Sequence, residues 1–194
     1  GDKEHKIPSL TPLELPLLEL NAGNLNLTLR NAKMFGMEKQ KINYIKYDKA
    51  LKRINFNIFF DLMTLASDYK VVGKILILPI SGEGKGLLDF KDADLKFSFD
   101  LKEMKNKDGK LVIKVDNPQL EPTFGGLHFK LENLFNGDKT LGDEMNRFLN
   151  ENWKEVLSEF QELVNGPMKS VMVRIASGFL NNLVLEDIFG DVEK

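Results

Sequence analysis

The feature of this sequence that most constrains its fold is a change in the spacing of its apolar residues. Between residues 13 and 134 they recur mostly at every second position, and from residue 141 to residue 189 they recur at every third and fourth. The first spacing is typical of strands with one buried face and the second of amphipathic helices. The sequence therefore predicts an α+β fold in which a long curved sheet is built first and helices are laid into it.

Turn-forming residues divide the first part of the chain into strands. Residues 48–49, 67–68 and 107–110 carry turn chemistry, and the last of these reads KDGK, a strong hairpin signal. We predict strands at residues 14–20, 24–30, 42–47, 54–60, 69–80, 95–101, 111–115 and 127–134. Pro16 lies inside the first strand, which predicts an edge position or a bulge there.

Two motifs in the strand region resemble ligand-binding loops, but a strand irregularity or a turn explains each of them better. Residues 81–86 read SGEGKG, without the GK[ST] ending and following helix of a phosphate-binding loop. We predict a bulged strand or a flexible corner there. Asp89, Asp92 and Asp94 predict a turn, and a weak calcium site is the alternative, although the twelve-residue calcium-loop pattern is absent.

The last third of the chain predicts two helices. Thr140 begins a capping arrangement, and apolar residues follow at helical spacing up to residue 164. Residues 165–167 read NGP, which predicts the end of this helix and the start of a second one. We expect a single domain over residues 1–194, with an extended leader (1–13), the sheet (14–135) and the helices (139–189).

Composition and charge exclude several classes of function. The formal net charge is −2, with lysines interleaved among acidic residues, so nucleic acid is not an expected partner. The absence of Cys excludes disulfides and thiolate metal sites. No apolar run is long enough to span a bilayer, and no signal peptide is present, although a mature or trimmed chain would have lost it.

Catalysis has little support in the sequence. The two His residues are His5, in the leader, and His128, on the polar face of a strand, and neither has acidic neighbours at a spacing that suggests a relay or a metal site. No Ser lies in a G-x-S-x-G sequence. We predict that the protein is not an enzyme and uses no cofactor or metal.

The apolar surface is therefore the main candidate for the function. Fourteen Phe against three Tyr and one Trp favour dry apolar volume, and seven Met suit an adaptable lining. The periodicity does not distinguish a closed core from an elongated cavity. The alternative is a membrane- or protein-docking module that uses the apolar helical face. The predicted lining consists of Leu15, Leu18, Phe56, Ile58, Phe60, Phe97, Phe99, Phe129, Leu131, Met145, Leu149, Trp153, Met172, Ile175 and Phe179.

Four segments resemble one known family. Residues 7–16 read IPSLTPLELP, similar to the IPxLxPLxIP opening of the insect takeout and haemolymph juvenile-hormone-binding proteins. Residues 24–32 (NLNLTLRNA), 82–84 (GEG) and 175–189, which end in LEDIF, resemble later motifs of that family in the same order. The resemblance implies a curved antiparallel sheet wrapped around a long helix, enclosing a hydrophobic tunnel. It also implies a secreted carrier of a small lipophilic ligand such as a terpenoid, a juvenile-hormone-like molecule or a fatty molecule.

Two departures from the family pattern sharpen this expectation. Family members usually carry a disulfide-bonded helical segment ahead of the IP motif, whereas this sequence begins after it and has no Cys. Either trimming or loss of that segment would leave one end of the tunnel open. The Tyr that binds the hormone epoxide aligns with Phe97. We therefore expect a takeout-like carrier of another apolar ligand in an insect fluid, working as a monomer that contacts membranes for ligand transfer.

Overall fold

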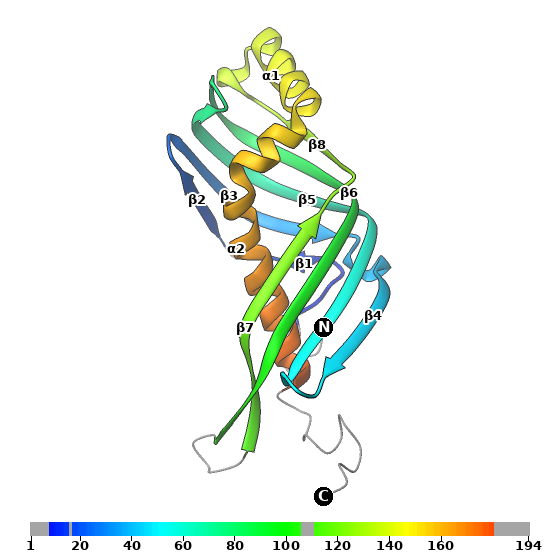
Figure 1. Cartoon of the computed structure of the whole chain (residues 1–194). Helices are drawn as coiled ribbons and strands as arrows, with labels where there is room; N and C mark the ends of the chain where they lie inside the picture. The colour runs from blue at the N-terminus through cyan, green and yellow to red at the C-terminus, as the bar shows by residue number, and fades with distance from the viewer. Residues whose placement is uncertain (1–7, 16, 106–110, 181–194) are drawn as a thin grey trace, which may run out of the picture.

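The computed structural model describes residues 8–15, 17–105 and 111–180 of the chain. Within these ranges, eight strands form one antiparallel sheet, and two α-helices lie against it. The strands are β1 (Leu13–Glu14), β2 (Leu18–Ala22), β3 (Leu25–Phe35), β4 (Lys41–Asp48), β5 (Arg53–Ile75), β6 (Leu78–Lys105), β7 (Leu111–Thr123) and β8 (Gly126–Leu131). The helices are α1 (Lys139–Glu151) and α2 (Trp153–Leu180), with short 3-10 helices η1 (Met37–Lys39) and η2 (Phe135–Gly137). Figure 1 shows the sheet curving around α2, which confirms the predicted α+β architecture.

The spine of the sheet is the long hairpin of β5 and β6, paired from Arg53 with Asp100 to Ile75 with Leu78 without a register shift. β4 and β7 flank one part of this hairpin, at residues 53–59 of β5 and 94–105 of β6. β3 and β8 flank the other part, at residues 64–72 of β5 and 86–91 of β6. The sheet therefore has two halves, named here the β4–β7 half and the β3–β8 half.

The sheet buries two clusters of apolar side chains, one centred on each half, and that of the β4–β7 half reaches into the β3–β8 half through Phe90 and Leu127. In the β4–β7 half, Phe97 and Phe99 are at most 3% exposed, whereas the intervening Ser98 is not buried. This cluster is rich in Phe, while the cluster in the β3–β8 half is mostly Leu, Ile and Val. Because Met172 joins the first cluster and Val156 the second, α2 covers both halves.

The break between the helices does not lie where the sequence predicted it. α2 continues through Gly166 and Pro167 as one helix of 28 residues. A proline inside a helix removes one backbone hydrogen bond and usually bends the helix. Here Val156 on one side of Pro167 and Met172 on the other are each at most 7% exposed. Burial on both sides therefore holds the two parts of α2 on the sheet.

The chain breaks instead at Asn152, whose backbone angles (φ −112°, ψ 29°) leave the helical region. The Asn152 side-chain amide donates to the Phe148 carbonyl at 2.8 Å, which satisfies a carbonyl at the end of α1. At its start, α1 is capped by Asp138, whose carboxylate accepts from the Leu141 amide at 3.0 Å. The predicted cap at Thr140 is therefore wrong by two residues.

The turn predicted at residues 67–68 and the single strand predicted over residues 69–80 are both wrong. β5 runs unbroken through Ser67 and Asp68, and the chain reverses at residues 76–77. Leu76 has a φ of 54°, in the left-handed region that Leu rarely adopts. Because an apolar pair forms this turn, the sequence carried no turn signal.

Other strand predictions need smaller corrections. Residues 82–86 form neither a bulge nor a corner, because they pair with β5 in regular register. Asp89, Asp92 and Asp94 lie within β6, so the predicted turn there is wrong. The strand predicted at residues 14–20 is divided into β1 and β2, which both pair with β3 at an edge of the sheet, and the last strand ends at Leu131. Pro16, residues 107–110 and residues 181–189 lie outside the described residues.

Candidate ligand-binding cavity

A cavity of about 160 Å³ lies between the β3–β8 half of the sheet and the helices. Its lining is almost wholly apolar. The side chains and backbone that line it belong to Leu20, Leu25, Leu27, Leu29, Leu65, Ser67, Tyr69, Val71, Ile75, Ile80, Gly86, Leu87, Leu88, Phe90, Leu127, Phe129, Leu131, Leu149, Val156, Leu157, Phe160, Leu163 and Val164. The cavity therefore draws on β2, β3, β5, β6, β8, α1 and α2.

Alternation along β3 and β5 supplies the sheet side of the cavity. Leu25, Leu27 and Leu29 occupy every second position of β3 and share its inner face. Leu27 pairs with Val71 of β5, so the two side chains lie side by side in the lining. The outward neighbour Val72 is 51% exposed. The period-two pattern thus carries the apolar side chains to the cavity and leaves the alternate positions to solvent.

The helix side of the cavity comes mainly from α2. Val156, Phe160 and Leu163 recur at spacings of four and three residues, which places them on one helical face. Val156 is 4% exposed, whereas Phe160 and Leu163 are half-buried. Leu149 of α1 is 1% exposed and closes the lining near the junction of the two helices.

The chain that leaves β8, residues 132–134, crosses close over β6 and is named here the crossing segment. The Glu132 carbonyl lies so close to β6 that a Cβ at Gly84 would be 2.6 Å from its oxygen, and a Cβ at Gly82 would be 2.9 Å from the Leu134 Cα. These glycines are required because no side chain fits between the strand and the crossing segment. This close approach explains the glycines at positions 82 and 84.

Tyr69 of β5 holds the crossing segment by a hydrogen bond. Its hydroxyl donates to the Glu132 carbonyl at 2.6 Å, and its side chain is 4% exposed. Burial raises the pKa of Tyr69 to about 12, and the nearby Glu132 carboxylate adds to the shift. The phenol is therefore neutral at physiological pH and keeps its proton for the hydrogen bond.

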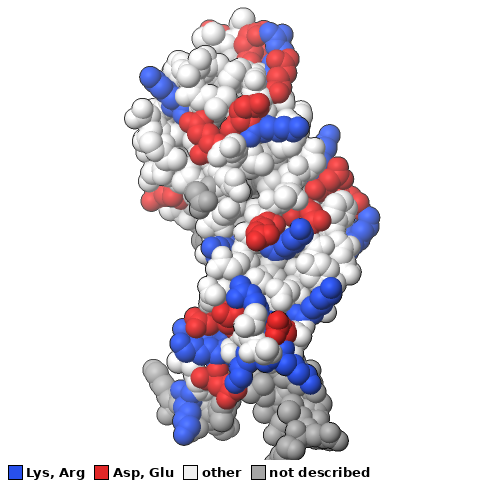
Figure 2. Space-filling model, in the orientation of Figure 1, with Lys and Arg blue, Asp and Glu red and all other residues white. Residues whose placement is uncertain are grey.

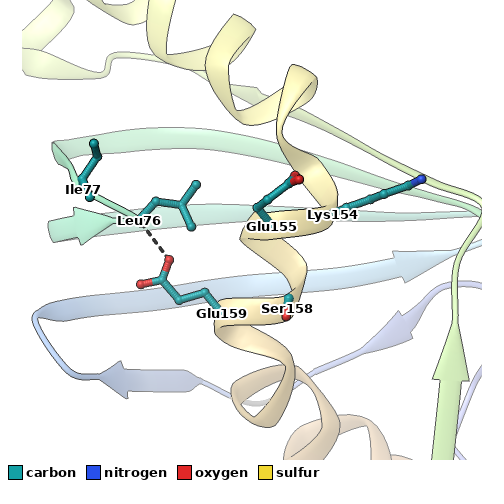
Figure 3. A pocket seen from close by; sticks show the side chains of 6 residues that line it. All are labelled: Leu76, Ile77, Lys154, Glu155, Ser158 and Glu159. Atoms are coloured by element: carbon teal, nitrogen blue, oxygen red, sulfur yellow. Dashed lines mark hydrogen bonds between the residues drawn. The ribbon is translucent and has the colours of Figure 1, made fainter.

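A larger hollow between the β5–β6 turn and α2 is a less suitable ligand site, because it is open to solvent and edged by charged side chains. Figure 3 shows Glu159 of α2 reaching toward the turn, where its carboxylate accepts from the Leu76 amide at 2.7 Å. The other α2 residues at the hollow include Lys154 and Glu155. This contact ties the tip of the hairpin to α2, near the Ile75 and Val156 side chains of the cavity lining.

The outer face of the sheet is polar and its charges are largely paired. Lys85 and Asn31 both donate to the Asp68 carboxylate, and these hydrogen bonds lower the pKa of Asp68. Lys70 and Glu83 form a second pair at 3.2 Å. Figure 2 shows basic and acidic side chains interspersed over one face of the molecule. Two outer hollows are edged by charged side chains, and one of them also reaches Ser67 and Gly86 of the cavity lining.

The structure distributes the predicted lining residues over both halves of the core. Phe129, Leu131 and Leu149 line the cavity. The mostly aliphatic cluster of the β3–β8 half includes or contacts Leu15, Leu18 and Met145. The Phe-rich cluster includes or contacts Phe56, Ile58, Phe60, Phe97, Phe99, Trp153 and Met172. Ile175 is half-buried, and Phe179 is 57% exposed.

Sequence reasoning did not select most of the residues that line the cavity. The Leu residues of β3 were predicted to share one buried face, and Val156, Leu157 and Phe160 were predicted on the apolar face of a helix. The signal that could have found them is the run of Leu at alternate positions, which gives a smooth aliphatic wall. Ser67 was missed because residues 67–68 were assigned to a turn, and Tyr69 was predicted to begin a strand but was not selected as a lining residue.

Within the described parts of the chain, no group of three or more His, Cys, Asp or Glu residues could hold a metal ion. The same residues include no helix long and apolar enough to cross a membrane. His128 lies on β8, paired with Asp89, and is not among the cavity residues. The cavity lining likewise contains no acidic or basic side chain.

Comparison with known proteins gives a consistent result. The sequence model of the haemolymph juvenile hormone binding protein (JHBP) family matches residues 1–190. The circadian clock-controlled protein daywake of Drosophila melanogaster is 24% identical over 200 residues, covering 97% of this chain and 77% of that protein. Its Drosophila yakuba counterpart is 22% identical over the same coverage. The crystal structure of Epiphyas postvittana Takeout 1 superposes with a TM-score of 0.85 at 28% identity, covering 94% of this chain and 85% of the other.

Proposed function

This chain belongs to the haemolymph juvenile hormone binding protein family, and from that premise we propose that it is a non-catalytic carrier of a small lipophilic molecule. The observation that carries the proposal is the cavity of about 160 Å³ with its almost wholly apolar lining. Burial of apolar surface drives such a ligand out of water at about 25 cal/mol per Å². A cavity of this character favours a hydrophobic guest over water, because a water molecule would find few hydrogen-bond partners.

The size of the cavity bounds the part of the ligand that it encloses. An apolar cavity of about 150 Å³ holds a molecule the size of benzene. A ligand longer than this must extend from the cavity or displace side chains of its wall. Leu20 of β2 and Leu163 and Val164 of α2 line the cavity and are only half-buried. We place the mouth between them, because in the described part of the chain β2 pairs with β3 alone and forms an edge of the sheet there.

The lining argues for binding without catalysis. Ser67 and Tyr69 are its hydroxyl-bearing side chains, and Tyr69 is engaged with the Glu132 carbonyl. A nucleophile needs an adjacent base, and among the residues that the structure describes no His, Asp, Glu or Lys lines the cavity. The cavity can therefore hold and release a ligand but offers no group to transform it.

A ligand other than juvenile hormone fits this chain better. The family resemblance aligns the hormone-binding Tyr with Phe97, which has no hydrogen-bonding group. Phe97 is 1% exposed and packs against Phe56 with ring centroids 5.2 Å apart. It lies in the β4–β7 half and is absent from the cavity lining. Recognition of an epoxide at this position would lack its donor.

We further propose that the carrier is a secreted monomer that exchanges its ligand at membranes. Paired charges on the outer face of the sheet support a monomer in aqueous fluid. Ile77 at the tip of the β5–β6 hairpin is 84% exposed. Lys74 precedes it by three residues, and Lys154 of α2 lines the same hollow. An apolar tip beside lysines suits transient contact with an anionic lipid surface. The apolar face of α2 is less suited to docking, because Val156 and Met172 are buried against the sheet.

The direct test is a titration with acetophenone followed by NMR of assigned Leu and Val methyl groups. Saturable shifts are expected at Leu25, Leu27 and Leu157, which line the cavity. Leu101 and Val115 are buried in the other cluster and serve as internal controls that should not respond. Absence of a saturable response, or a response confined to Leu101 and Val115, would contradict the proposed site.

A further inference from the structure

One polar group in the cavity lining has no structural task, namely the hydroxyl of Ser67. Ser67 lies on β5 between Leu65 and Tyr69, all three on the inner face of the strand and all lining the cavity. A hydroxyl on an apolar wall is costly unless it makes a hydrogen bond. The lining therefore contains a polar atom whose partner has to be identified.

Among the described residues, Ser67 has no hydrogen-bond partner. Tyr69, its neighbour on the same face, differs because its hydroxyl donates to the Glu132 carbonyl. In the described part of the chain, Asn165 Oδ1 is the fully enclosed side-chain atom that lacks a partner. The Ser67 oxygen is not enclosed in this way, because Ser67 is half-buried and borders an outer hollow as well as the cavity, so its hydroxyl retains free space beside it.

That space is provided by Gly86, which pairs with Ser67 across β5 and β6. A Cβ at Gly86 would lie 3.8 Å from Ser67 Oγ and 3.3 Å from both Tyr69 Cδ1 and Leu131 Cδ2. The missing side chain leaves a notch with the Ser67 hydroxyl at one side and apolar atoms at the others. The notch is suited to one small polar atom of a molecule that is otherwise apolar.

We infer that Ser67 is a specificity-determining residue that donates a hydrogen bond to a single oxygen acceptor of the ligand, such as a ketone, ester or ether oxygen. This inference rests on the proposed function of the cavity. An oxygen-bearing ligand would satisfy the Ser67 hydroxyl, whereas a hydrocarbon would leave it unpaired or trap a water molecule against it. A pure hydrocarbon is therefore disfavoured relative to an oxygen-bearing ligand of the same shape.

The position of Ser67 also orients the ligand. Across the β3–β8 half the strands lie in the order β2, β3, β5, β6 and β8. Ser67 and Gly86 lie on β5 and β6, away from the edge strand β2 where we place the mouth. The oxygen end of the ligand would thus enter first, and the apolar remainder would extend past Leu27 and Leu20 toward the mouth.

The test compares acetophenone with α-methylstyrene, which replaces the carbonyl oxygen by a CH₂ group of similar size. The Kd of each is measured by methyl NMR for the unmodified protein and for Ser67→Ala. We expect Ser67→Ala to weaken acetophenone binding about fivefold and to leave α-methylstyrene within about twofold. Ser81→Ala is the matched control, because Ser81 lies on the same pair of strands but on the outer face. Its neighbours Ile80 and Gly82 face inward, and its partner across the strands is the exposed Val72.

The outcomes separate this inference from the proposed function. If both probes bind and Ser67→Ala changes neither the two Kd values nor their ratio, Ser67 does not select the ligand, although the cavity still binds it. If neither probe binds to the unmodified protein, the proposed function fails as well. Equal weakening of both probes by Ser67→Ala would indicate a change in shape and would also overturn the inference.

Discussion

Helix α2 covers two regions of the core that are filled in different ways. In the β4–β7 half, the rings of Phe56, Phe97 and Phe99 lie with centroids 5.2 to 6.3 Å apart on neighbouring strands. In the β3–β8 half, aliphatic side chains face the helix around a cavity of about 160 Å³. The rings therefore fill their half by direct contact with one another, whereas the aliphatic side chains of the other half leave space between them. The β4–β7 half is thus filled by rings, whereas the space proposed for the ligand lies in the other half of the same sheet.

The largest expected effect is a loss of stability on emptying the Phe-rich half. Phe97 is 1% exposed and contacts two other rings, so Phe97→Ala should lower the free energy of unfolding by about 3 to 5 kcal/mol. Phe59→Ala is the matched control, because Phe59 is half-buried on the other face of β5, beneath Lys41 Nζ at 5.7 Å. It should cost less than half as much in urea-induced unfolding.

The same residue tests the division of labour between the halves. Phe97→Leu keeps the site apolar and should leave the Kd for acetophenone within about twofold, because Phe97 is not in the cavity lining. A tenfold loss of affinity with little change in stability would show instead that the ligand reaches the Phe-rich half. The contact of Phe97 with ligand that was predicted from the sequence would then be confirmed.

The second prediction fills the cavity. Leu27 is half-buried in the lining, and Leu27→Trp should occupy the space meant for the ligand and weaken acetophenone binding at least tenfold. The free energy of unfolding should change by no more than about 1.5 kcal/mol, because the added ring enters an existing void. Val72→Trp is the control on the outer face of the neighbouring strand, where Val72 is 51% exposed. Undiminished binding by folded Leu27→Trp would place the ligand elsewhere.

The third prediction concerns the hydrogen bond from Tyr69 to the Glu132 carbonyl. Tyr69→Phe leaves the Glu132 carbonyl without its donor and should lower the free energy of unfolding by about 1 to 2 kcal/mol at pH 7. The pKa of Tyr69 is raised from 10.0 to about 12 in the folded protein. The folded state therefore holds its proton more tightly than the unfolded state. This contribution is complete below pH 10 and is lost as the pH rises from 10 to about 12.

The pH dependence gives the measurement that isolates Tyr69. Urea unfolding at several pH values should show a steeper loss of stability above pH 10 for the unmodified protein than for Tyr69→Phe. Tyr44→Phe is the matched control and should retain the steep loss, because Tyr44 lies on β4, outside the cavity lining. Equal slopes for all three proteins would show that Tyr69 is not held in its buried hydrogen bond.

The fold could be predicted from the sequence where alternation and turn chemistry agree. The apolar positions of residues 95–101 and 25–29 assign inner faces correctly, because period-two burial depends only on the backbone. The β5–β6 turn could not be predicted, since Leu76 and Ile77 form it and a left-handed Leu has no sequence signal. The same holds for the continuous α2, because tertiary burial outweighs the local preference of Gly166 and Pro167.

The candidate site was less predictable than the fold. A sequence tells which face of a strand is apolar, but empty space depends on how side chains from distant strands meet. Phe residues dominated the predicted lining because large apolar groups suggest apolar contact, yet the large rings of Phe97 and Phe99 pack against each other. Ser67 could be recognised only after β5 was seen to run through residues 67–68, which brings its hydroxyl to the inner face.

The smallest expected effect tests the helix that joins the two halves. Gly166 lies inside α2, and a Cβ there would meet no atom within 4 Å. Gly166→Ala should therefore raise the free energy of unfolding by roughly 0.5 to 1 kcal/mol, as expected for Gly to Ala inside a helix. Gly137→Ala is the opposite control, because Gly137 has a φ of 85° and a Cβ there would be strained. If Gly166→Ala destabilised the protein, Gly166 would end a helix, as the sequence suggests. The part of α2 that packs on one cluster and the part that packs on the other would then be separate helices. A stabilised Gly166→Ala would support one continuous helix that reaches from Val156 at the cavity to Met172 in the Phe-rich cluster.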